Sequence, residues 1–167
     1  MTRLFFIFLT AFVMDNLIVY FLPIQPIYEY YIVIPNVLLT SLVLFCFYDR
    51  NDYILGIAAI LGLMYDICYA DLLGLYLFVF ILVVYLVKRY MINLMPVNLL
   101  SILGLMNICI VIKEGIVYFI VQTLKGTNLM MSEFATTVLV PTLLVNLIIV
   151  TITYFVLKPQ FRQVMRS

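Results

Sequence analysis

The sequence predicts an all-α integral membrane protein, built as a bundle of six transmembrane helices. Apolar residues make up 67% of the 167 residues and charged residues only 10%, whereas a soluble domain has roughly 45–50% apolar and about 25% charged residues. So few charges cannot cover a soluble surface. The apolar residues gather in six long runs, and the breaks between these runs are short and contain polar residues or proline.

Each run is long enough, or nearly long enough, to cross a bilayer, because a helix of about 20 residues spans about 30 Å of hydrocarbon. The predicted spans are residues 4–22, 31–48, 53–69, 72–87, 94–124 and 134–157. We find no internal repeat and no domain boundary, so residues 1–167 are expected to form a single transmembrane domain.

The fifth run is longer than a membrane requires. As one helix, residues 94–124 would extend about 46 Å, well beyond the hydrocarbon. Two forms are open: a single helix, or a span that is broken near residues 113–115, where Lys113, Glu114 and Gly115 follow one another.

The basic residues predict the orientation, because cytoplasmic segments of membrane proteins collect lysine and arginine. With the N-terminus inside, seven basic residues fall on the inner side and one, Lys125, in an outer loop. The seven are Arg3, Arg50, Lys88, Arg89, Lys158, Arg162 and Arg166. We therefore expect both termini in the cytoplasm.

The composition also excludes several function classes. There is no histidine, and none of the three cysteines forms a CxxC pair, which argues against zinc sites and histidine-based catalysis. A net charge of +1 provides no broad basic face for nucleic acid. The longest loops have about eight residues, too few for a soluble catalytic domain. We expect no catalytic residues, no cofactor and no metal, and hence no enzyme; the membrane lipid is the expected surrounding.

Four ionisable residues lie inside the predicted spans: Asp15, Asp66, Lys113 and Glu114. Such residues are costly in hydrocarbon and are by default candidates for function. Three interpretations are open: a proton or ion relay, a pair of glycosidase-like carboxylates, or acids that hydrogen-bond between helices and fix their register. We favour the third, with Lys113 as a partner for Asp66, because further polar groups that would extend a relay are missing near Asp15.

The third span carries small residues on one face. Ala58, Gly62 and Asp66 are spaced by four, and small residues at this spacing let another helix backbone approach closely. Gly74 opens the following span and permits a similar close contact.

The last span carries a polar stripe and a proline. Thr142, Asn146 and Thr153 lie on one face, which we interpret as a hydrogen-bonded seam within the bundle, the alternative being a substrate site. Pro141 removes a backbone donor, so we expect a kink there, with Thr137 or a neighbour satisfying the freed carbonyl.

Several of these segments resemble the rod shape-determining membrane protein family MreD. The resemblance rests on two neighbouring pieces, Gly56-Ile-Ala-Ala-Ile-Leu-Gly62-Leu-Met-Tyr-Asp66 and Leu73-Gly74-Leu-Tyr76. Glu114 and the piece Pro141-Thr-Leu-Leu-Val-Asn146 are similar to Gram-positive members. Asn36 departs from the family, because some relatives have an arginine at this position after the proline.

The resemblance implies a non-enzymatic subunit of the cell-wall elongation machinery in the bacterial cytoplasmic membrane. It implies a single-span partner, MreC, and through MreC the glycosyltransferase RodA and a class B penicillin-binding transpeptidase. The residues expected to serve structure or partner packing are Asp15, Ala58, Gly62, Asp66, Gly74, Glu114, Pro141 and Asn146.

The family's six-helix architecture is similar to that of the substrate-binding subunits of energy-coupling-factor vitamin transporters. That similarity implies an alternative function, as such a subunit. Those proteins dock through an alanine-x-x-x-alanine stripe on the first helix, whereas the first span here has Ala11 alone. An intramembrane enzyme is a third alternative, weakened by the missing histidine.

Overall fold

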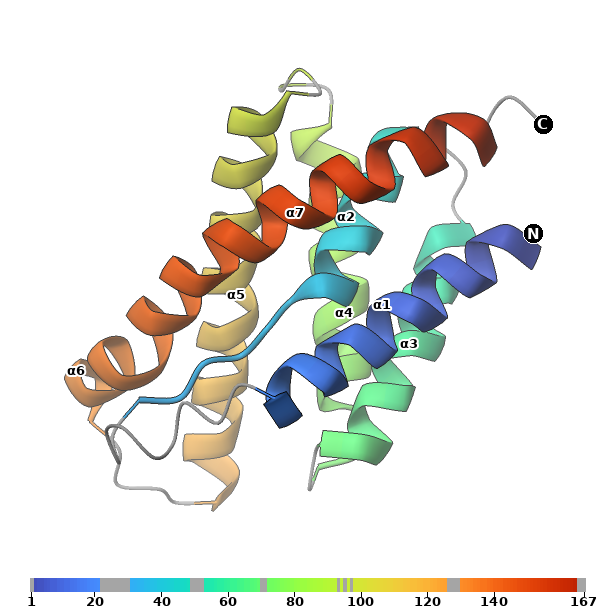
Figure 1. The fold of residues 1–167 in the computed structure, drawn as a ribbon. Coiled ribbons are helices and arrows are strands. Elements are labelled where there is room, and N and C mark those ends of the chain that lie inside the picture. The colour runs from blue at the N-terminus through green and yellow to red at the C-terminus, as the bar shows by residue number, and fades with distance from the viewer. Residues whose placement is uncertain are drawn as a thin grey trace.

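The computed structural model describes residues 2–21, 31–48, 53–69, 72–92, 94, 96, 98–125 and 130–164, and within them it contains helices and no strand. The all-α prediction is confirmed (Figure 1). The helices are α1 (Thr2–Phe21), α2 (Val37–Tyr48), α3 (Tyr53–Tyr69), α4 (Leu75–Leu86) with the π-helical turn η1 (Val87–Met91), α5 (Leu99–Lys125), and α6 (Met131–Phe134) with η2 (Ala135–Leu139) and α7 (Val140–Val164).

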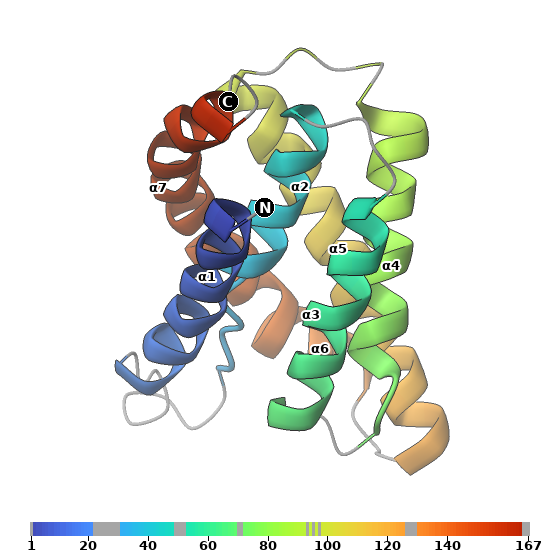
Figure 2. The same ribbon diagram turned by 90° about the vertical axis from the view of Figure 1, so that its right-hand side faces the viewer.

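Successive long helical segments run in alternating directions. Figures 1 and 2 show α1, α3 and α5 running away from the end where the chain begins, and α2, α4 and α7 returning to it. Three helical stretches of the described residues are long and apolar enough to cross a membrane: Leu4–Phe21, Leu99–Leu124 and Met131–Phe161. Helices α2 and α3 are also apolar but are shorter than these three stretches.

Helix α2 lies at the centre of the bundle. Every residue from Leu38 to Cys46 is buried, and α2 contacts α1, α3, α4, α5 and α7. A helix that is apolar on all sides is stable only when other elements surround it. Its 12 residues extend about 18 Å, so α2 covers little more than half of the hydrocarbon thickness.

The predicted second span, residues 31–48, is only partly helical. Residues 31–36, which we call the strap, have no helical structure, and the helix begins at Val37. Pro35 provides the local reason, because proline pushes the residue before it away from helical geometry and has no N–H to donate. The prediction of a helix over residues 31–36 was therefore wrong.

Helices α3 and α4 pack backbone against backbone. A Cβ atom added to Gly62 would lie 2.6 Å from the Leu77 Cα atom and 2.7 Å from the Tyr76 carbonyl oxygen, distances that no side chain tolerates. Ala58, one turn earlier, is fully buried. The predicted close approach is confirmed at Gly62, and the approaching backbone is α4 of the same chain. The similar contact expected at Gly74 was wrong, because a Cβ atom added there would meet nothing within 4 Å.

The fourth helix begins later than predicted, at Leu75 instead of residue 72. Gly74 precedes it with φ +98°, a left-handed conformation that glycine adopts without the strain a side chain would cause. Residues 72–74 form a turn for this reason.

Helix α5 is continuous from Leu99 to Lys125. Of the two forms left open, the structure adopts the single helix and has no break near residues 113–115. Lys113 and Glu114 are each only 1% exposed. Because both charges are accommodated inside the bundle, they do not need to end the helix at an interface. The helix starts after Pro96, and the Asn98 side chain accepts a hydrogen bond from the Ser101 N–H at 2.8 Å.

Candidate functional site

Asp15 on α1 binds the start of α2. Its carboxylate accepts hydrogen bonds from the N–H groups of Val37 at 2.7 Å and Leu38 at 3.0 Å, and from the Tyr65 hydroxyl at 2.6 Å. The first N–H groups of any helix lack partners within that helix, and the helix dipole favours a negative charge there. Asp15 thus acts as a capping residue supplied by another helix.

Asp66 on α3 does the same for α4. One carboxylate oxygen accepts from the Tyr76 N–H at 2.7 Å, and the other from Gly74 at 2.9 Å and Leu77 at 3.1 Å. Asp66 is 1% exposed. The suggested pair of Asp66 with Lys113 is not formed; the carboxylate is used by the backbone of α4 instead.

Lys113 is on α5, and its side chain reaches the start of α2. Its ammonium group donates to the Asn36 side-chain oxygen at 2.6 Å and forms an ion pair with Glu114 at 2.8 Å. The Tyr76 ring centre lies 6.0 Å from Nζ, close enough for a weak cation–π attraction. A buried ion pair offsets the free-energy cost of its desolvation only when it makes such additional contacts. These groups therefore connect α5 to Asn36, the residue just before α2.

The strap is attached to the last helical segment by hydrogen bonds. The Ile32 N–H donates to the Thr137 carbonyl at 2.9 Å, and the Ile34 N–H donates to the Thr142 hydroxyl at 3.2 Å. The Asn146 amide donates to the Ile34 carbonyl at 2.8 Å. The predicted seam within the bundle is confirmed for Thr142 and Asn146, and its partner is the strap.

Pro141 explains why the Thr137 carbonyl is available. Proline has no N–H for the carbonyl four residues earlier, and the helix forms the π-helical turn η2 just before it. The freed carbonyl is satisfied by the Ile32 N–H of the strap. The prediction that Thr137 or a neighbour would satisfy it was wrong, because the Thr137 hydroxyl donates to the Glu133 carbonyl instead.

The predicted site residues therefore fall into two groups. Ala58, Gly62, Asp66 and Gly74 belong to the contact between α3 and α4, while the others lie around the start of α2, the strap and α5. The others are Asp15, Glu114, Pro141 and Asn146.

Asn36 and Tyr65 were missed as contributors to these groups. Asparagine just before an apolar run is a helix-start signal, so Asn36 could have been recognised. No local signal connects Tyr65 to Asp15, which lies 50 residues away in the sequence.

The donors around both aspartates decide their chemistry. Five of the six hydrogen bonds that the two carboxylates accept come from backbone N–H groups, and the sixth comes from Tyr65. Backbone amides cannot pass a proton onward at a useful rate because they do not titrate. The arrangement fits a structural role, in which the acids hold helices in register.

The comparison with protein families matches residues 1–164 to the rod shape-determining protein MreD. The chain belongs to the MreD family. This family consists of shape-determining membrane proteins, so this MreD protein has a role in determining rod shape, and its apolar helices fit a membrane location.

No curated protein and no solved structure matches the chain. The likeness to energy-coupling-factor subunits, and the transporter function that it implied, therefore receive no support from known structures. The family is one of structural proteins, which supports the non-enzymatic interpretation.

Substitutions of Asp66 distinguish capping from proton transfer. Asp66→Leu leaves three N–H groups around the start of α4, those of Gly74, Tyr76 and Leu77, without an acceptor. We expect it to lower stability by about 2 kcal/mol. Asp66→Asn keeps one oxygen but turns its NH₂ group toward an N–H donor, so we expect a loss of about 1 kcal/mol. Thermal unfolding in detergent and the rod shape of complemented cells measure both. Equal loss of function in the two variants, with little change in stability, would support a relay.

Proposed function

We propose that this MreD protein is a non-enzymatic membrane subunit that holds the transmembrane helix of a partner and so organises cell-wall synthesis. The partner is a single-span protein of the MreC type. Through it the protein scaffolds RodA and a class B penicillin-binding transpeptidase, which maintains cell shape.

The observation that carries this proposal is the use of the buried polar groups. Asp15, Asp66 and Lys113 are each occupied by backbone or side-chain groups of the same chain. What the molecule presents outward is a set of large apolar side chains, concentrated on α1 and α7, such as Phe5, Phe21 and Phe155. A surface of this kind meets other proteins within the bilayer, through close packing and a few interhelical hydrogen bonds.

We further propose six membrane passes with both termini in the cytoplasm. Figure 2 shows the end of α4 and the last turns of α7 at the end of the bundle where α1 begins. Lys88 and Arg89 lie in η1, which directly follows α4, and Lys158 lies in the last part of α7, which supports this orientation. The strap and α2 together complete the second pass, and the hydrogen bonds of the strap to α7 make this irregular backbone tolerable in a membrane.

Thiol labelling tests the orientation. In a background without the native cysteines, Met130→Cys should react with an impermeant thiol reagent in intact cells, because Met130 is exposed at the predicted outer end. Tyr90→Cys, exposed at the opposite end, should react only after the membrane is opened. Labelling of position 90 in intact cells would contradict the proposed orientation.

A helix exchange tests the partner. Co-produced MreC-type protein should co-purify with this chain after its external domain is removed, because the contact lies in the membrane. Replacement of its transmembrane helix by an unrelated apolar helix should abolish co-purification. If the truncated partner were lost while the helix-swapped partner was retained in full, docking through the membrane helix would be wrong.

A further inference from the structure

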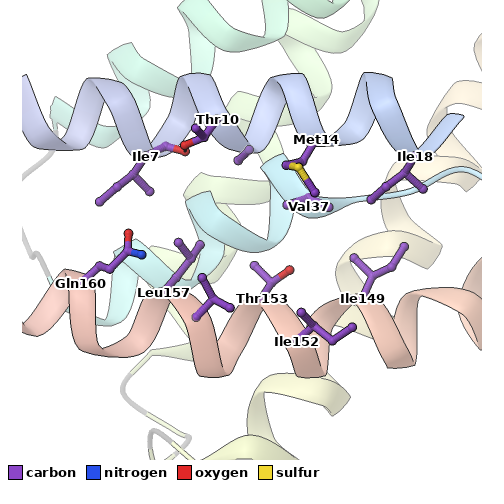
Figure 3. Close-up of a pocket in the computed structure, with 12 residues that line it drawn as sticks. Ile7, Thr10, Met14, Ile18, Val37, Ile149, Ile152, Thr153, Leu157 and Gln160 are labelled. Atoms are coloured by element: carbon purple, nitrogen blue, oxygen red, sulfur yellow. The ribbon is translucent and has the colours of Figure 1, made fainter. Parts of the chain in front are cut away.

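An apolar groove runs between α1 and α7. It has a volume of about 430 Å³, and α2 contributes Val37 to its floor. Figure 3 shows Met14 and Ile18 of α1 facing Ile149 and Thr153 of α7 across this space, with the strap continuing from Val37 between the two helices. The groove is neither an enclosed cavity nor a flat surface, so in a bilayer either lipid or protein covers its open side.

Thr153 places an unused hydroxyl in this groove. Other threonines on the helices, including Thr10 and Thr151, donate to the carbonyl four residues earlier, which is the usual solution in apolar surroundings. Within the described part of the chain, the Thr153 hydroxyl has no hydrogen bond, although the residue is 7% exposed. In hydrocarbon such a group gains from a polar partner on another helix.

The strap provides a second unused polar group. Ile32 forms a hydrogen bond with η2, and Ile34 forms hydrogen bonds with α7. Among the residues that the structure describes, the N–H and carbonyl of Val33 have no partner. Figures 1 and 3 show the strap lying between α7 and α1. Irregular backbone at membrane depth must be covered by protein or water.

We propose that the groove between α1 and α7 is the seat of the partner's single transmembrane helix. A lipid chain fills apolar volume but offers no hydrogen bond, whereas a polypeptide offers both apolar contact and an acceptor for the Thr153 hydroxyl, which lines the groove. This inference rests on the proposed function and assigns the surface that the function uses. Small residues on the partner helix would let its carbonyl groups reach the Thr153 hydroxyl.

A second groove provides the internal comparison. It lies between α1 and α3, has a volume of about 530 Å³, and is lined by apolar side chains and Tyr53. It is the larger of the two but carries no unused polar group of the kind seen at Thr153. We assign this groove to lipid, and it tests the choice of surface.

Two matched tryptophan variants test the assignment. Ile149 lines the α1–α7 groove and Ile57 lines the α1–α3 groove, and both are half-buried. With a co-produced MreC-type partner, Ile149→Trp should reduce the recovered partner at least about tenfold, because the indole occupies the space of the partner helix. Ile57→Trp should leave recovery unchanged. The opposite result would overturn the assignment.

The hydroxyl is tested by a second matched pair. Thr153→Val should reduce recovery severalfold, whereas Thr151→Val should not, since the Thr151 hydroxyl already binds the Leu147 carbonyl. Equal recovery with both variants would contradict the part assigned to Thr153.

Photo-crosslinking in the otherwise unchanged protein avoids any effect of these variants on folding. A photoreactive residue at position 152, exposed in the α1–α7 groove, should crosslink to the partner, and one at position 60, exposed in the α1–α3 groove, should not. If the partner were recovered with all variants and crosslinked only from position 60, the groove assignment would be wrong, while the proposed function would still hold. A wild-type protein that neither retains nor crosslinks the partner would overturn both.

Discussion

The start of a helix inside hydrocarbon is the constraint on which this structure depends. Its first N–H groups have no partner within the helix and no water to bind. Helices α2 and α4 both begin in buried positions, and in each case an aspartate from the preceding helix supplies the acceptors. The two acids are thereby neutralised in effect by helix dipoles and do not need separate counter-ions.

The rest of the architecture follows from these two caps. Because Asp15 fixes where α2 begins, the strap must cover the remaining distance to that end of the bundle as non-helical chain. That backbone then needs partners, which the Pro141 region of the last helix provides through the Thr137 carbonyl, Thr142 and Asn146. On the other side of the bundle, Asp66 holds α4 against α3 closely enough that only glycine fits at position 62.

Hydropathy predicted the helical class, because long apolar runs leave few alternatives. The third span, 53–69, was predicted with the bounds that the structure has, since polar residues flank it on both sides. The strap was missed although Pro35 is a local signal against a helix, because residues 31–34 are as apolar as those of a helix. Its attachment to α7, and that of the following Val37 to Asp15, depend on residues that lie far away in the sequence. The partners of Asp66 and Lys113 depend on the relative placement of three helices, which spacing along one helix does not contain.

Hydrogen exchange of the α2 amides tests the account most directly. In detergent, the amides of Val37 and Leu38 should be strongly protected in the wild-type protein, because the Asp15 carboxylate accepts both N–H groups. Asp15→Leu should increase exchange of a peptide covering the start of α2 by at least about tenfold, while a peptide from the middle of α3 keeps its protection. Unchanged protection at the start of α2 in this variant would contradict the claim that Asp15 holds the helix in place.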